Sequence, residues 1–176
     1  MSKTLIAYYS RSGGNYVSGN IVDLPVGNTE IIAQTICGLT GASLFKIEQA
    51  KPYSPAYNEC VRQAQADLRA NARPALLKKP DSLEPFDTII LAYPNFCGTM
   101  PMAVFTFLEA FDFSGKSILP LCTHEGSGMG KSESDLRRLC PQAKLRPGLA
   151  VKGSNVKNAR ETVRQWLESI AAGQHE

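Results

Sequence analysis

Apolar and polar positions along this chain follow two patterns that predict a regular succession of strands and helices. Short runs that are fully apolar, or that alternate with polar residues, are typical of strands, whereas apolar residues three and four positions apart indicate helices. The short runs predict strands over Lys3–Tyr9, Ser43–Ile47, Thr88–Ala92, Ser117–Cys122 and Lys144–Val151. The helical spacing predicts helices over Asn28–Gly38, Tyr57–Asn71, Met102–Phe111, Leu136–Cys140 and Val156–Ala172. This alternation predicts an α/β fold, a doubly wound five-stranded parallel sheet with helices on both faces.

Start and stop signals support several of these boundaries. Pro101 stands where prolines begin helices, at the first helical position. The stretch from Ser132 to Asp135 matches a capping box ahead of the fourth predicted helix. Pro147 and Gly148 fall inside the last predicted strand, so we expect that strand to be irregular.

Composition narrows the picture mainly by exclusion. The 176 residues fit a single domain over 1–176, and the hydrophobic content of 43% is ordinary for a soluble globular protein. The net charge of +3 is too small to argue for nucleic-acid binding, and the apolar stretches are too short to span a membrane. The first four residues lack the apolar segment of a signal peptide. Five widely spaced cysteines without a C-x-x-C pair favour reduced thiols in the cytoplasm over disulfides or a metal site.

A split phosphate-binding loop is the strongest chemical signal. The apolar run Leu5–Tyr9 leads directly into the hydroxyl- and glycine-rich turn Ser10–Gly14, and Val26–Glu30 later opens the first predicted helix. Glycines let backbone N–H groups converge, hydroxyls donate hydrogen bonds, and a helix N-terminus carries partial positive charge, which together suit a phosphate. The chain has neither a Walker lysine nor G-x-G-x-x-G, which argues against the phosphates of ATP or of a dinucleotide.

Two further loops follow strands that should end at the same edge of the sheet. They are Tyr93–Pro101 after the third predicted strand and Thr123–Gly130 after the fourth. In doubly wound sheets the ligand lies at the carboxyl ends of the strands, near the point where strand order reverses. We therefore expect these two loops and the split phosphate loop to form one site.

Taken together, these motifs resemble the flavodoxin-like proteins that bind flavin mononucleotide (FMN), and in particular a bacterial branch with a split phosphate loop. The matching pieces are Tyr9-Ser10-Arg11-Ser12-Gly13, Val26-Gly27-Asn28-Thr29-Glu30, Tyr93-Pro94-Asn95, Gly98-Thr99-Met100-Pro101 and Cys122-Thr123-His124. Relatives in this branch usually carry tryptophan around the position of Phe96 and Cys97, whereas the only tryptophan here is Trp166 in the last predicted helix.

The resemblance implies three sets of FMN contacts. The phosphate contacts are Ser10, Arg11, Ser12, Asn28 and Thr29. The ribityl and ring contacts are Pro94, Asn95, Phe96, Cys97, Gly98 and Thr99. The loop that closes over the other side of the ring supplies Thr123, His124, Glu125, Gly126 and Ser127.

Several of these residues also have an alternative interpretation. Asn28 and Thr29 could be helix caps, which use the same donors as a phosphate site. Phe96 could fill the core, and Cys97 is more readily a passive thiol than a redox-active one. The inserted segment Asn15–Pro25 is predicted as a surface hairpin, with a lid that contacts the flavin through Tyr16 as the alternative.

The implied function is electron transfer, since the flavin supplies redox chemistry and the protein supplies position and electrostatics. The favoured hypothesis is an electron carrier that serves a redox partner protein. The alternative is an NAD(P)H-dependent FMN oxidoreductase that acts on quinones or similar small-molecule acceptors, and a third class is a flavin-binding regulatory module without turnover. We expect no nucleic acid and no membrane among the partners, and the oligomeric state stays open.

Overall fold

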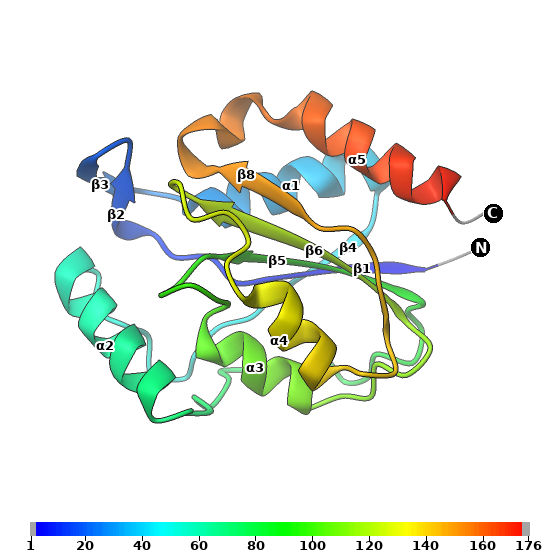
Figure 1. Ribbon diagram of the computed structural model, residues 1–176, viewed down its shortest axis with the longest axis horizontal. Helices are drawn as coiled ribbons and strands as arrows, with labels where there is room; N and C mark the ends of the chain where they lie inside the picture. The colour runs from blue at the N-terminus through cyan, green and yellow to red at the C-terminus, as the bar shows by residue number, and fades with distance from the viewer. Residues whose placement is uncertain (1–2, 174–176) are drawn as a thin grey trace.

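A parallel β-sheet forms the centre of the computed structural model, which describes residues 3–173 (Figure 1). Its strand order is β4-β1-β5-β6, with β7 and β8 pairing one after the other along the outer side of β6. The strands are β1 (Thr4–Tyr8), β4 (Ser43–Lys46), β5 (Thr88–Pro94), β6 (Ser117–His124), β7 (Lys144–Leu145) and β8 (Leu149–Lys152). If β7 and β8 are taken as one interrupted strand, this is the 2-1-3-4-5 order of flavodoxin-like sheets. The predicted five-stranded doubly wound sheet is confirmed.

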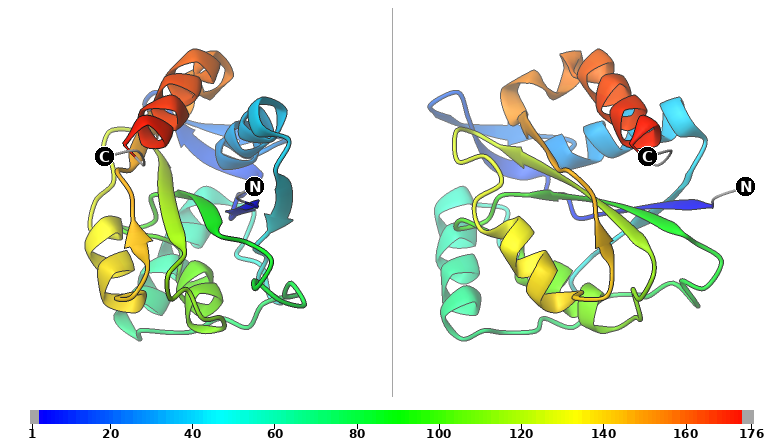
Figure 2. Two further views of the ribbon diagram at one scale, coloured as in Figure 1. Left: turned by 90° about the vertical axis from the view of Figure 1, so that its right-hand side faces the viewer. Right: turned by 45° about the vertical axis from the view of Figure 1, so that its right-hand side comes forward.

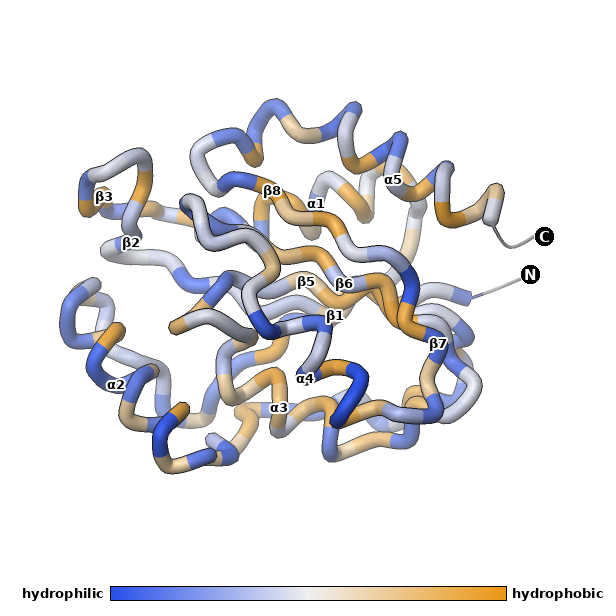
Figure 3. Tube along the Cα trace, viewed as in Figure 1, coloured by the Kyte–Doolittle hydropathy of each residue, from blue (hydrophilic) through white to orange (hydrophobic). Residues whose placement is uncertain are grey.

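Helices cover both faces of the sheet (Figures 1 and 2). On one face lie α1 (Asn28–Thr40) and α5 (Arg160–Ala172), and on the other lie α3 (Met102–Glu109) and α4 (Ser132–Leu139). The strands separate two hydrophobic cores because successive side chains point to opposite faces. Leu5 and Ala7 of β1 pack in the core under α3 and α4, whereas Ile6 and Tyr8 pack in the core under α1 and α5. Figure 3 shows mostly apolar residues along the central strands and polar residues interspersed with apolar ones along α2 and α5.

The helix α2 (Tyr57–Arg69) lies to one side of these layers (Figure 1). Its buried residues are Cys60 and Ala64, and Figure 1 shows the helix beside the carboxyl-end edge of the sheet rather than across the middle of a sheet face. This position makes α2 a side wall for whatever lies at that edge.

The last predicted strand and the last predicted helix are each divided in two. Pro147 and Gly148 separate β7 from β8, as the irregularity of that stretch suggested. The predicted helix over 156–172 begins instead as a 3₁₀ helix, η1 (Gly153–Asn158), and the α-helix α5 starts at Arg160. Its apolar face still packs as expected, with Trp166 buried and its Nε1–H donating to the Pro147 carbonyl oxygen over 2.9 Å.

Two predicted helix starts are wrong in detail. Ser132 is the first residue of α4 and not its cap, because the preceding residue Lys131 takes the cap position without a side-chain hydrogen bond. The Ser132 hydroxyl is instead buried, where it donates to the Met129 carbonyl over 2.6 Å and accepts from the Tyr93 hydroxyl over 2.8 Å. Pro101 is the cap of α3 and not its first helical residue, since the helix begins one residue later, at Met102.

The inserted segment forms a separate two-stranded antiparallel sheet, β2 (Gly13–Val17) and β3 (Asn20–Leu24). This confirms the predicted hairpin. None of its ten strand residues is buried, so the hairpin has no core of its own. Figure 1 shows it beyond the carboxyl ends of β1, β5 and β6, on the same side as α2.

Candidate functional site

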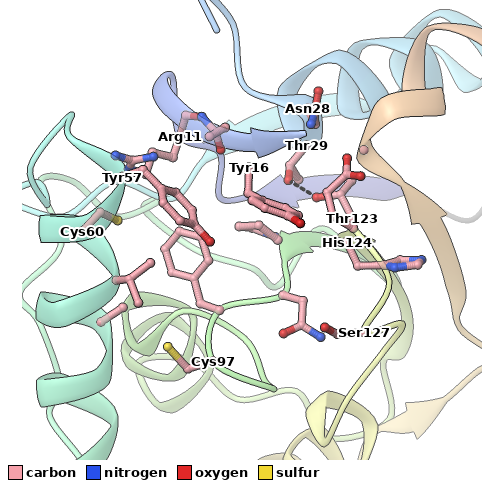
Figure 4. Close-up of a pocket in the computed structure, with 18 of the residues that line it drawn as sticks. Arg11, Tyr16, Asn28, Thr29, Tyr57, Cys60, Cys97, Thr123, His124 and Ser127 are labelled. Carbon is pink, nitrogen blue, oxygen red and sulfur yellow. Dashed lines mark hydrogen bonds between the residues drawn. The ribbon is translucent and has the colours of Figure 1, made fainter. Parts of the chain in front are cut away.

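A pocket of about 440 Å³ opens where β1, β5 and β6 end (Figure 4). This is where strand order reverses, because the chain passes from β1 to β4 on one side and then to β5 on the other. The volume lies within the range of small-molecule sites. The lining residues come from the two phosphate-loop segments, the hairpin, α2, and the loops after β5 and β6.

The two halves of the split loop touch at Gly27. A Cβ placed there would lie 2.2 Å from Ser10 Oγ and 2.6 Å from the Arg11 carbonyl oxygen, so only glycine fits. Gly27 is also the cap residue of α1, which means that neither Asn28 nor Thr29 is the cap. Ser10 fulfils that role from a distance, since its Oγ accepts the Glu30 N–H over 3.0 Å. The Ser10 O–H therefore remains available to donate into the pocket.

The helix end and the loop after β6 are joined by a pair of hydroxyls. Thr29 Oγ1 and Thr123 Oγ1 lie 2.8 Å apart, and both residues are buried. Figure 4 shows this bond next to Asn28 at the upper end of the pocket. Helix N–H groups without partners, together with these hydroxyls, form an anion-binding end of the pocket.

Arg11 braces the phosphate loop from the side. Its Nη2 donates to the Ser54 carbonyl oxygen over 2.7 Å, and its Nη1 donates to the Gly14 carbonyl oxygen. Its Nε is buried and has no hydrogen-bond partner. A buried donor without an acceptor is costly, so a ligand oxygen beside this Nε–H would be stabilising.

The loop after β5 makes a tight turn over Phe96, Cys97, Gly98 and Thr99. The Phe96 N–H donates to the Thr99 carbonyl over 2.8 Å, and the two central residues have φ values of 56° and 89°. Positive φ at both central positions is typical of type I′ turns, in which a residue other than glycine, asparagine or aspartate is uncommon at the first position. The turn holds Phe96 against the pocket.

Phe96 both packs against the core and lines the pocket, which are the two alternatives that the sequence left open. Its ring packs edge-on against Tyr9 at a centroid distance of 5.7 Å and lies 6.5 Å from Tyr53, which joins it to the core. It also lines the pocket. The Tyr9 hydroxyl donates to Gln49 Oε1 over 2.6 Å, which fixes the ring against which Phe96 rests.

The loops after β5 and β6 are locked together. Asn95 Nδ2 donates to the Gly128 carbonyl over 2.9 Å, and the Lys131 N–H donates to the Gly98 carbonyl over 2.7 Å. A Cβ at Gly130 would lie 2.2 Å from the Gly98 carbonyl oxygen, so this approach also requires glycine. The two loops thus form one rigid wall instead of two independent flaps.

Several of the titratable groups that line the pocket are fixed by hydrogen bonds to the backbone. Nδ1 of His124 accepts the Gly126 N–H over 2.9 Å, so the neutral ring carries its proton on Nε2. Glu125 Oε1 accepts the Ser154 N–H over 2.7 Å. Burial raises the pKa of the Cys97 thiol, which keeps it protonated near neutral pH and supports the passive interpretation.

The structure brings most of the predicted contact residues to this one pocket. The predicted residues that line it are Ser10, Arg11, Asn28, Thr29, Pro94, Asn95, Phe96, Cys97, Gly98, Thr123, His124, Glu125 and Ser127. Three predicted residues, Ser12, Thr99 and Gly126, are not among its lining residues. Ser12 is exposed to solvent, and the Thr99 hydroxyl donates away from the pocket to Asp135 Oδ2.

Sequence analysis missed the α2 wall. Tyr57, Cys60, Val61, Ala64 and Gln65 all line the pocket from one side of this helix. Their spacing predicts a helix face that packs against something, but spacing does not distinguish a core from a cavity. Tyr16 of the hairpin, weighed earlier as a lid contact, also lines the pocket.

Comparison of the sequence with models of known protein families identifies the family of this chain. A model of the flavodoxin family matches residues 3–170. The chain belongs to the flavodoxin family. This confirms the resemblance stated from the motifs, and with it membership of an FMN-binding family. Among curated proteins, none matches the chain.

Solved structures agree on the fold. A candidate flavoprotein from Bacteroides eggerthii is 25% identical to this chain with a TM-score of 0.79, and the match covers 97% of this chain and 99% of that one. One from Bacteroides uniformis is 27% identical with a TM-score of 0.75, over 95% and 98% of the two chains. A Lactobacillus acidophilus flavoprotein solved in complex with FMN is 16% identical with a TM-score of 0.62, over 90% and 98%, and this likeness shows the fold alone.

The residues present fit the FMN that the family implies. The two halves of the split loop lie close together at Gly27, at the start of α1. The buried Nε–H of Arg11 has no partner in the protein, so a ligand oxygen could accept its hydrogen bond. At the opposite end, the pocket is lined by flat and apolar side chains such as Phe96 and Val61. A phosphate suits the first end and an isoalloxazine ring suits the second.

Proposed function

We propose that this flavodoxin-family protein binds FMN in the pocket and serves as an electron carrier. The observation that carries the proposal is that the split phosphate loop, at the switch point of the sheet, opens into one cavity that also presents the apolar side chains of Phe96 and Val61. When bound there, FMN supplies the redox chemistry. The protein positions the cofactor, limits its contact with water and sets the local charge.

The anionic end of the pocket would hold the phosphate. The Ser10 hydroxyl, the backbone N–H groups at the start of α1 and the Arg11 Nε–H are its donors. Thr29 and Thr123 share one hydrogen bond between their hydroxyls, so the hydroxyl that accepts it keeps its own O–H to donate to the phosphate. Charge-assisted hydrogen bonds of this kind contribute about 1.5–3 kcal/mol each.

The locked loops after β5 and β6 would hold the flavin ring. The turn at Cys97 and Gly98 directs Phe96 toward the pocket, and the Asn95 amide is fixed by bonds to both loops. Because Asn95 Nδ2 and Oδ1 are occupied within the protein, we assign this residue the role of holding the wall. The backbone of the turn is then the part that meets the polar edge of the ring.

No lining side chain is needed as an acid, base or nucleophile for this role. Burial raises the pKa of both pocket thiols, Cys60 and Cys97, so neither is a thiolate near neutral pH. The charged lining residues, Arg11 and Glu125, are bound to backbone groups. This supports a carrier, in which partners exchange electrons with the flavin itself.

The test is the cofactor and its response to a reductant. The purified protein should be yellow and should release FMN on denaturation, and FAD as the sole flavin would overturn the proposal. Anaerobic NADPH should then leave the flavin spectrum unchanged over minutes. Rapid bleaching by NADPH would reject the carrier and favour the NAD(P)H-dependent oxidoreductase acting on small acceptors such as quinones.

We further propose that the carrier works in the cytoplasm with a redox partner protein. All five cysteines are free thiols, which suits a reducing compartment. No helix within residues 3–173 is long and apolar enough to cross a membrane. Size-exclusion chromatography of the loaded protein with and without a candidate reductase would test the partnership.

A further inference from the structure

Two tyrosines at the mouth of the pocket come from elements outside the three flavin loops. Tyr16 lies on β2 of the hairpin, and Tyr57 is the first residue of α2. Their ring centroids are 6.2 Å apart with an interplanar angle of 30°, and both side chains line the pocket (Figure 4). Tyr16 is nonetheless 44% exposed, so a large aromatic face remains uncovered at this opening.

The hairpin that carries Tyr16 is attached firmly at its base. The Gly14 N–H donates to the Pro55 carbonyl over 2.9 Å, and a Cβ at Gly14 would lie 3.1 Å from the Tyr57 backbone nitrogen. The Arg11 guanidinium bridges the carbonyls of Gly14 and Ser54. These contacts fix the base of the hairpin beside the start of α2.

The tip of the hairpin is held differently. The Ser18 N–H donates to Glu125 Oε2 over 3.3 Å, and the other oxygen of that carboxylate accepts the Ser154 N–H at the start of η1. Glu125 thus connects the tip to the body of the protein through one long hydrogen bond. Since no strand residue of the hairpin is buried, opening the tip requires little loss of apolar contact.

We propose that Tyr16 and Tyr57 form an aromatic clamp on the flavin ring, and that the hairpin carrying Tyr16 is a lid latched by Glu125. The inference rests on the proposed binding of FMN. The loop after β5 contributes one aromatic side chain, Phe96, and no tryptophan. The two tyrosines would give the pocket a second aromatic surface. Closure of the lid brings Tyr16 against the ligand, and release of Ser18 from Glu125 opens the way in.

The clamp is tested by titrating apoprotein with FMN and with riboflavin. Tyr16→Ala and Tyr57→Ala should each weaken both ligands by the same factor, about twofold to tenfold, because both tyrosines act on the ring and not on the phosphate. Tyr16→Phe should restore the affinity. Ile21→Ala is the matched control, because Ile21 pairs with Tyr16 across the hairpin but does not line the pocket.

The outcomes separate the clamp from the proposed function. If the wild-type protein binds FMN and Tyr16→Ala binds both flavins equally well, the clamp is rejected while FMN binding stands. If Ile21→Ala loses as much affinity as Tyr16→Ala, the effect comes from the hairpin fold and the clamp is again rejected. If the wild-type protein binds neither flavin, the proposed function and the clamp both fall.

The lid is tested by the kinetics of FMN association and release. Glu125→Ala should accelerate both rates by a common factor of about five, because the latch bond exists whether the pocket is empty or filled. Asp23→Ala, which removes a carboxylate from the same hairpin, should leave both rates unchanged. Faster release with unchanged association would instead make Glu125 a direct ligand contact and overturn the lid.

Hydrogen exchange gives a readout that does not depend on these variants. Amides of Gly13–Leu24 should exchange several-fold more slowly in the FMN-loaded protein than in the apoprotein, because the closed lid is stabilised by the ligand. Equal exchange in the two states would show a static hairpin and overturn the lid.

Discussion

The replacement Gly27→Ala isolates the close approach that builds the phosphate end of the pocket. Gly27 has φ −66° and ψ 152°, a conformation that alanine adopts without strain. The added methyl group would nevertheless lie 2.2 Å from Ser10 Oγ and 2.6–2.8 Å from the Arg11 backbone. The cost therefore comes from space alone.

The magnitude follows from what must move. Forcing the two halves of the loop apart costs about 1–3 kcal/mol, as for other overpacked sites. Displacing Ser10 also removes the hydrogen bond that caps Glu30 N–H, which is worth about 1 kcal/mol. We expect a total loss of about 2–4 kcal/mol in the free energy of unfolding. At 2–4 °C per kcal/mol for a chain of this size, the melting temperature should fall by roughly 5–15 °C.

A second glycine in the same helix provides the control. Gly38 lies within α1, and a Cβ there would meet only the end of the Arg160 side chain at 3.7 Å. Gly38→Ala should therefore raise the free energy of unfolding by about 0.5–1 kcal/mol through helix propensity. Replacing glycine with alanine should thus lower the free energy of unfolding at position 27 and raise it at position 38, eleven residues away.

Thermal melts of the two apoproteins and flavin titrations check this reasoning. In Gly27→Ala the affinity for FMN should fall by at least about tenfold, with a much smaller change for riboflavin, which lacks the phosphate. If the melting temperature of Gly27→Ala equals that of the wild-type protein, the two loop halves are not in contact as described. If both flavins lose affinity equally, the site as a whole is damaged and the phosphate assignment gains no support.

Three further predictions concern single groups. Ser10→Ala should weaken FMN by one to two decades, whereas Ser12→Ala, which lies outside the pocket, should match wild type in titrations. Burial raises the pKa of Cys122 to about 12 and of Cys140 to about 11 from 9.0, so the unfolded chain loses these protons first. The contribution of these two thiols to stability should then be constant below pH 9 and fall between pH 9 and 12, and a melting temperature that stays constant over that upper range would contradict this. Glu125→Gln should make the flavin potential less negative in a potentiometric titration, because a carboxylate beside the pocket opposes added negative charge.

The sheet and its ligand edge were predictable from sequence because their signals are local. Each strand is a short apolar run, and the order of strands and helices restricts the topology to a few choices. The glycines and hydroxyls of the split loop could be picked out for the same reason, since they stand next to a strand end or a helix start. Even so, sequence could not separate Ser10, which reaches into the pocket, from Ser12, which points to solvent.

The errors occur where distant segments override a local signal. The sequence around Ser132 is typical of a helix cap. Its hydroxyl is instead buried, where it accepts a hydrogen bond from the Tyr93 hydroxyl and donates one to the Met129 carbonyl. The α2 wall has the pattern of a helix packed on a core, yet its face meets a cavity formed by segments on both sides of it in sequence. Neither outcome is encoded in spacing, because each depends on contacts made across the fold.

The interruption at Pro147 and Gly148 also bears on how the protein behaves at high concentration. An outermost strand with a continuous row of free amide and carbonyl groups invites pairing with another chain. Here that row is split into a two-residue and a four-residue piece, each with an exposed lysine, Lys144 and Lys152. Side chains from the body of the protein occupy the break between β7 and β8. Met129 and Glu133 lie beside Gly148, and the Pro147 carbonyl oxygen accepts a hydrogen bond from Trp166. This packing thus protects the outer border of the sheet against the edge-to-edge growth that begins aggregation.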